Sequence, residues 1–151
     1  MPERKTLARA VRDRRQGKAA TTQAGEFVRE EIHHVREGKH GARSAKQAIA
    51  IGLSKARRAG VDLKPPKKGT TSEKTRRSAA SAYAAGHDDT KKPVSARRSR
   101  AVESALEREG HSAASKTALS RQAKSAARKR SAADRSAAAR KAAKTRARRA
   151  H

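Results

Sequence analysis

Large apolar residues are concentrated in the first half of the chain, where they recur with the spacing of an amphipathic helix. In residues 23–37 the apolar positions fall within about 140° of arc at 100° per residue, and they are Ala24, Phe27, Val28, Ile32 and Val35. Gly38 follows directly and has the conformational freedom of a helix C-cap. The pattern predicts a helix over residues 23–37.

A second helix is predicted over residues 45–59, with Ser44 as its N-cap and Gly60 at its end. One face carries mostly small side chains, namely Ala45, Ala48, Ile49, Gly52, Leu53, Ala56 and Ala59. Another helix can approach such a face closely. The two helices therefore predict a helical hairpin module over 23–64, whose Ala/Gly face offers a surface for self-association.

The rest of the chain divides into three parts. Residues 1–22 form a basic N-terminal segment with a short helix. Residues 65–94 contain Pro65, Pro66 and Pro93 and are expected to be a linker. Residues 95–151 form a basic arm, in which a short helix ends at Gly110 and no Gly or Pro follows Ser112. The expected fold is mostly α, a small hairpin module plus a long basic Ala-rich C-terminal arm, helical or partly disordered.

Charge changes this picture most. The chain has 40 Lys and Arg against 14 Asp and Glu, a formal net charge of +26. Residues 111–151 hold thirteen Lys and Arg and a single acid, Asp134. On one helix these cations lie all round the axis, and Leu119 is the last large apolar residue. The arm therefore lacks the apolar stripe of a core helix or a membrane-surface helix, and it suits a polyanion.

These features predict histone-like, largely sequence-independent binding and compaction of duplex DNA through phosphate contacts. The chain contains one Phe, one Tyr and no Trp, so it has few rings for stacking on single-stranded bases. The expected nucleic-acid-binding residues are Arg43, Lys46, Lys55, Arg57, Arg58, Arg121, Lys124, Arg128, Lys129, Arg130, Arg135, Arg140, Lys141, Lys144, Arg146, Arg148 and Arg149.

Two alternatives remain at the level of the sequence. One is an RNA-binding or ribosome-associated assembly protein. The other is a site-specific DNA-binding regulator in which the 45–59 helix enters the major groove, with Lys46, Gln47, Lys55, Arg57 or Arg58 at base edges and a supporting helix from residues 6–16. The turn between the two predicted helices is longer than a helix-turn-helix usually has.

No enzyme, metal or cofactor chemistry is expected. The residues considered as metal ligands are Glu30, His33, His34, Glu37 and His40. Glu30 with His34, and His33 with Glu37, are pairs four residues apart, but no third ligand stands at a fixed spacing. No nucleophile with a base, and no phosphate-cradling glycine loop, can be identified. There is no cysteine, signal peptide or long apolar stretch, so the expected location is cytoplasmic and nucleoid-associated.

The segments EEIHHVREGKHGARSA, KQAIAIGLSKARRAG and KPPKKG, within residues 23–69, resemble a family of small basic bacterial proteins of uncharacterised function, sometimes labelled DNA-binding or plasmid-stabilisation proteins. The segment ALSRQAKSAARKRSAA is similar to the Lys/Ala-rich tails of bacterial proteins that resemble linker histone H1. The resemblance implies a bacterial origin and an association with DNA, and it supplies no catalytic residues.

Overall fold

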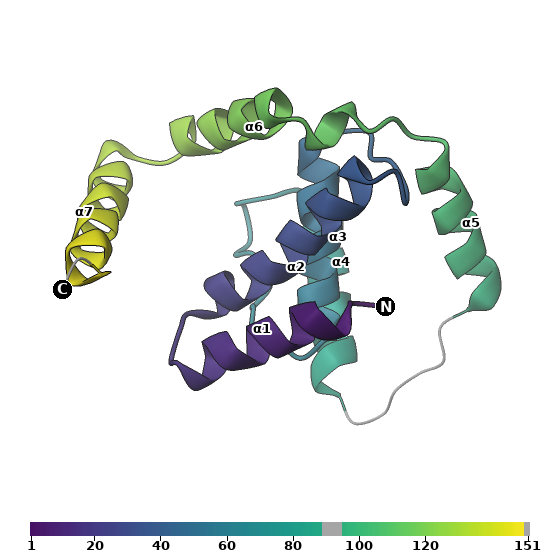
Figure 1. The fold of residues 1–151 in the computed structure, drawn as a ribbon, viewed down its shortest axis with the longest axis horizontal. Coiled ribbons are helices and arrows are strands. Elements are labelled where there is room, and N and C mark those ends of the chain that lie inside the picture. Colours follow the sequence, from purple (N-terminus) through teal and green to yellow (C-terminus); the bar gives the residue numbers. More distant parts are fainter. Residues whose placement is uncertain (89–94, 150–151) are drawn as a thin grey trace. The chain divides into compact units, whose positions relative to one another are not determined.

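The computed structural model describes residues 1–88 and 95–149, and within them every regular element is a helix (Figure 1). The mostly-α prediction is therefore confirmed. The elements are α1 (Arg4–Arg15), α2 (Ala20–Arg36), α3 (Ala45–Arg58), α4 (Glu73–His87), α5 (Ala96–Glu107), the short 3-10 helix η1 (Ser112–Ala114), α6 (Lys116–Arg128) and α7 (Ala132–Arg149). The chain divides into two compact units, Met1–Ser115 and Lys116–His151. In the described part of the chain, no helix is both long and apolar enough to cross a membrane.

The first unit is built around the pair α2 and α3, with α1 against α2 and α4 against α3 (Figure 1). Phe27 and Val35 of α2 are among its largest fully buried side chains. Alanines fill most of the remaining interior. The core is small, because alanine brings little apolar area to bury.

The predicted turn chemistry accounts for the ends of α2 and α3. Gly38 follows α2 with a φ of +75° and Gly60 follows α3 with a φ of +84°, the left-handed region that favours glycine. The Ser44 side chain accepts a hydrogen bond from the Gln47 backbone N–H, as an N-cap does. α2 begins at Ala20, three residues earlier than predicted, because the threonines at its start are tolerated in the first turn.

Part of the small face of α3 packs against α2 within the same chain. Ala48, Gly52 and Ala56 are buried, and a Cβ on Gly52 would stand 2.6 Å from the Cα of Val28 in α2. The backbones of α2 and α3 are therefore in direct contact at this point. Helix α2 covers this part of the face, whereas Ile49 and Leu53 are half-buried and Ala59 is exposed, and self-association stays a prediction.

Helix α4 occupies residues 73–87, within the range expected to be a linker. Its N-cap Ser72 accepts from the Thr75 N–H at 3.3 Å, and its Ala79 and Ala82 are buried. The Tyr83 hydroxyl donates to Asp62 Oδ1 at 2.6 Å. A polar helix with an alanine face thus packs on α3. Residues 89–94 of the expected linker, including Lys91, Lys92 and Pro93, lie outside the described residues.

The chain returns to this unit after α5, the short helix predicted before Gly110. Backbone hydrogen bonds run from Gly41 N–H to the Leu106 carbonyl at 2.9 Å and from Ala42 N–H to the Gly110 carbonyl at 3.0 Å. Ala114 in η1 is fully buried. Residues 106–115, placed in the arm by the sequence analysis, are therefore bonded to the hairpin module.

In the second unit the basic tail forms two helices, α6 and α7. The break at residues 129–131 has neither Gly nor Pro. Ser131 caps α7 there: its hydroxyl donates to Asp134 Oδ2 at 2.7 Å and accepts from the Asp134 N–H at 3.1 Å. An N-cap serine starts a new helix here, although the propensity of the segment favours a continuous one.

Candidate nucleic-acid interface

Three of the four cations of α6 are gathered on one stripe, and Lys116, at the first position of the helix, lies outside it. Arg121, Lys124 and Arg128 fall within about 60° of arc at 100° per residue, because they are spaced by three and four positions. Together with Ser125 and Lys129 they line a shallow surface depression. A row of exposed cations along a shallow depression has the charge and shape to accept a phosphate chain.

The cations of α7 surround its axis instead. Those whose side chains are described are all exposed: Arg135, Arg140, Lys141, Lys144, Arg146 and Arg148. Arg149 is the last residue of the helix. The Arg135 guanidinium also donates to the Arg130 carbonyl at 2.9 Å, across the break before α7. A helix charged on all sides can meet phosphates in any orientation about its axis.

Acidic side chains are nearly absent from this second unit. Residues 116–151 contain thirteen Lys and Arg and the one acid Asp134, a net charge of +12. The Asp134 carboxylate accepts a hydrogen bond from Ser131, which holds it at the start of α7. The favourable position of an acid at a helix N-terminus explains its presence in an otherwise basic segment.

In the first unit, three of the predicted contact residues have exposed side chains. Arg43, Lys46 and Arg58 are exposed at or near the two ends of α3. Lys46 and Arg58 are twelve residues apart, which places them about 120° apart around the helix. These cations can add phosphate contacts but do not form a single reading face.

Lys55 and Arg57 make contacts within the fold, so they are less suited to contact nucleic acid than the exposed cations. Lys55 Nζ lies 2.6 Å from Oε2 of the fully buried Glu31. Arg57 is only 7% exposed, and its Nε donates to the Leu63 carbonyl at 2.9 Å. Burial lowers the pKa of the Arg57 guanidinium, which stays charged because its ordinary value is so high. Moving either side chain to a phosphate would break the fold's own contact.

The residue best suited to read a base in α3 is also engaged. The Gln47 side-chain oxygen accepts from the Arg43 N–H at 2.9 Å, and its backbone N–H donates to Ser44 Oγ at 3.2 Å. Gln47 thereby completes the N-terminal cap of α3. Helix α1 does pack on α2, as the regulator hypothesis requires, but α3 keeps only Lys46 and Arg58 as exposed basic side chains.

Both large aromatic rings make contacts within the first unit. Phe27 is 1% exposed in the core of the first unit. Tyr83 stacks on His87 with ring centroids 3.9 Å apart and donates its hydroxyl to Asp62. The chain has no Trp and no other Phe or Tyr. Single-strand recognition by stacking therefore has at most the half-buried Tyr83 ring among the Phe, Tyr and Trp side chains.

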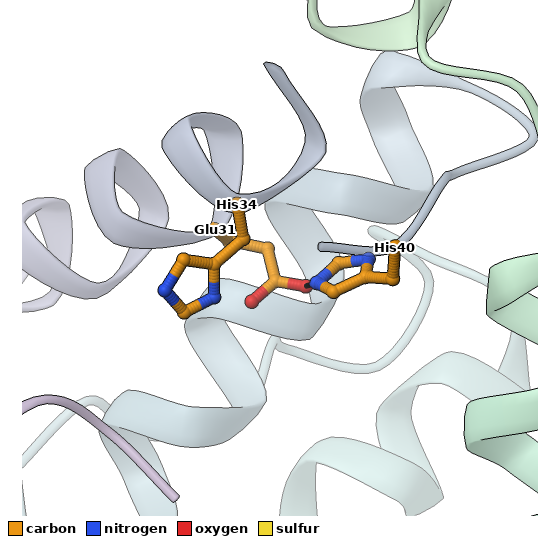
Figure 2. Close-up of side chains that lie close together, drawn as sticks. All are labelled: Glu31, His34 and His40. Atoms are coloured by element: carbon orange, nitrogen blue, oxygen red, sulfur yellow. Dashed lines mark ion pairs between the residues drawn. The ribbon is translucent and has the colours of Figure 1, made fainter. Parts of the chain in front are cut away.

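The structure gathers a set of ligand-type side chains that the sequence analysis did not anticipate. Glu31, His34 and His40 each place one ligand atom within 4.8 Å of the other two (Figure 2). Of the pairs considered from spacing, His33 is exposed, and Glu30 accepts a hydrogen bond from the Glu3 N–H at 3.2 Å. Only the return of the chain after Gly38 brings His40 back to α2, and no fixed spacing signals that.

Among known proteins, a family match was found only for the part of the chain that contains the first three helices. Residues 3–68 match a family model described as a family of unknown function (DUF6496), which spans α1, α2 and α3. No curated protein and no solved structure matches the chain. The class that the fold defines is an all-helical, strongly basic protein.

Proposed function

We propose that this protein is a non-enzymatic, histone-like binder of duplex DNA that coats or compacts it with little sequence preference. In this proposal α6 and α7 supply most phosphate contacts, and Arg43, Lys46 and Arg58 add contacts from the first unit. The observation that carries the proposal is the net charge of +12 over residues 116–151, whose described Lys and Arg side chains are all exposed. A location on the bacterial nucleoid follows from the proposal.

The arrangement of charge favours a phosphate backbone over a protein partner. Like charges on one helix repel one another, at Arg121, Lys124 and Arg128 in particular, and a bound phosphate chain relieves that repulsion. Each cation that neutralises a phosphate releases counterions, so eight contacts correspond to a slope of about −7 in a plot of log K against log salt. Affinity then falls steeply with salt.

The aromatic rings of the chain favour a duplex over single-stranded RNA as the partner. Stacking on aromatic rings stabilises most single-strand complexes, and Phe27 and Tyr83 are both engaged within the first unit. The caps of α3 hold Gln47 away from any base edge. Affinity is therefore expected to come from phosphate contacts, with base sequence contributing little.

Two charge-matched triple variants test the proposal. Arg121→Gln/Lys124→Gln/Arg128→Gln neutralises the α6 stripe, and Arg97→Gln/Arg98→Gln/Arg100→Gln removes the same charge from exposed positions of α5. Binding to a duplex of arbitrary sequence is measured over a salt series. The α6 variant is expected to reduce the magnitude of the salt slope by about 3, and the α5 variant by less than about 1.

Comparison of the two variants distinguishes contacts made by the α6 stripe from a general effect of the protein's net charge. Equal losses in the two variants would mean that the α6 stripe is no more important than any other part of the basic surface, and the proposed interface would be wrong. Competition by structured RNA at matched salt is measured alongside. A clear preference for RNA would overturn duplex DNA as the partner in favour of the RNA-assembly alternative.

A further inference from the structure

Glu31, His34 and His40 form a compact cluster inside the first unit (Figure 2). Glu31 and His34 lie one turn apart on α2, and His40 comes from the loop between α2 and α3. The side chain of Glu31 is 0% exposed, that of His34 13% and that of His40 16%. The cluster is therefore screened from solvent and combines the nitrogen and oxygen ligands that Zn²⁺ uses.

The hydrogen bonds of His40 fix which of its nitrogens can act as a ligand. Its Nδ1 lies 3.0 Å from the Gly41 carbonyl oxygen, which can only accept, so Nδ1 carries a proton. Its Nε2 lies 3.1 Å from Glu31 Oε1. A neutral His40 ring would place a lone pair against a carboxylate oxygen. This contact requires a positive charge, either on the ring or on an ion between the two atoms.

His34 is held in a matching way. Its Nε2 lies 2.9 Å from Oε1 of Glu3, and a carboxylate accepts from that nitrogen. The lone pair of a neutral His34 ring is then on Nδ1, the nitrogen on the Glu31 side of the ring (Figure 2). A carboxylate or a backbone carbonyl on the second nitrogen is the usual support of a metal-binding histidine. Both histidines of the cluster have such support.

Glu31 keeps one oxygen for an ion. Lys55 Nζ lies 2.6 Å from Oε2, whereas His40 lies against Oε1. Both carboxylate oxygens are buried, and among the described residues neither has a hydrogen bond of good geometry. A carboxylate that binds a metal through one oxygen commonly has a donor on the other, and Lys55 is in place as that donor.

From these contacts we infer that the protein binds one divalent transition-metal ion, of which Zn²⁺ is the best fit, through Glu31 Oε1, His34 Nδ1 and His40 Nε2. Two histidines and a carboxylate make a three-ligand set whose fourth position is taken by water. The ion would link the last turns of α2 to the loop that leads into α3. The site therefore stabilises the helical module, and it does not depend on whether the second unit binds DNA.

The test uses the full-length protein freed of metal with a chelator and titrated with Zn²⁺ alone. We expect one saturable site per chain and a rise in the unfolding temperature on binding. Co²⁺ at the same site should give the visible absorption of a tetrahedral complex. His40→Gln and His34→Gln are each expected to lower Zn²⁺ affinity by roughly 100-fold or more, since ligand loss exceeds the 10- to 100-fold effect of losing outer-shell support.

His33→Gln is the matched control, because His33 neighbours His34 on α2 but is exposed and outside the cluster. It should leave Zn²⁺ affinity unchanged. A loss of affinity in this control would show that Zn²⁺ binds at His33 instead and would contradict the assigned ligand set. Absence of saturable binding would overturn the inference. Equal affinity in the full chain, His40→Gln and His34→Gln would overturn it as well.

Discussion

The Arg36 guanidinium donates through Nε to the carbonyl oxygen of Ala114 at 2.8 Å, joining the end of α2 to a residue 78 positions later. Ala114 is fully buried beside α2 and α3. The contact closes the first unit immediately before α6 begins at Lys116. The boundary between the packed module and the exposed basic helices therefore lies near Ser115, well after the proline-containing segment where composition changes.

Arg36→Met is expected to loosen the docking of residues 109–115 without unfolding the hairpin. The variant keeps an aliphatic stem but leaves the buried Ala114 carbonyl without its donor, at a cost of about 1–3 kcal/mol. Hydrogen exchange of the amides in residues 110–115 should become faster. Arg29→Met, at an exposed position on the same helix, is the control and should leave that exchange unchanged.

Gly52→Ala is expected to destabilise the first unit, although alanine favours a helix more than glycine does. The added Cβ would stand 2.6 Å from Val28 Cα, so α2 and α3 must separate, at a cost of about 1–3 kcal/mol. Gly25→Ala is the matched comparison, since a Cβ there meets nothing within 4 Å. It should stabilise α2 by about 0.5–1 kcal/mol. Urea unfolding measures both, and destabilisation of equal size in the two variants would contradict the close helix contact.

Tyr83 should titrate at a higher pH in the folded protein than in the unfolded chain. Its hydrogen bond to Asp62, and then desolvation, raise the pKa of the phenol above its ordinary value of 10.0. Stabilisation from this bond is therefore present below pH 10.0 and is lost as the pH rises through the folded-state pKa. Because Tyr83 is the one tyrosine, absorbance of the phenolate reports this site alone. Asp62→Asn should move the midpoint back toward 10.0, and an unchanged midpoint would contradict the contact.

Ser131→Ala separates helix structure from charge in the second unit. Loss of the cap is expected to cost the start of α7 about 1 kcal/mol and to lower helicity over the first turn, as seen by NMR chemical shifts. Ser136→Ala, inside α7, should keep or raise helicity. Both variants retain every cation, so the salt slope of duplex binding should stay the same. A large change in slope for Ser131→Ala would show that the contacts need the α7 N-terminus to be formed.

The sequence was sufficient to predict the hairpin of α2 and α3. Phe27 and Val35 follow the helical period of α2, and Ser44 and Gly60 mark the two ends of α3. It was insufficient for α4, whose buried face consists of alanines such as Ala79 and Ala82 and has no large apolar residue to count. Basic side chains were identified by type alone, so Lys55 and Arg57 were grouped with the exposed cations. Burial and the partners Glu31 and Leu63 distinguish them, and these depend on tertiary packing.

The cluster of Glu31, His34 and His40 was beyond prediction for the same reason. His40 reaches α2 only because the loop after Gly38 turns back, and its ring is oriented by the Gly41 carbonyl. The sequence analysis did find the two histidines of α2 and their neighbouring acids, but it paired them four residues apart. Packing of the loop selects the pair three residues apart instead.

The most direct test of the central claim measures duplex DNA affinity of the full chain and of residues 1–115 over a salt series. The truncated chain keeps the whole first unit and loses the thirteen cations of residues 116–151. We expect a steep slope for the full chain, about −7 if eight phosphates are contacted, and weaker binding with a flatter salt dependence for residues 1–115. Equal affinity and equal slope for the two proteins would contradict the claim that α6 and α7 bind the DNA.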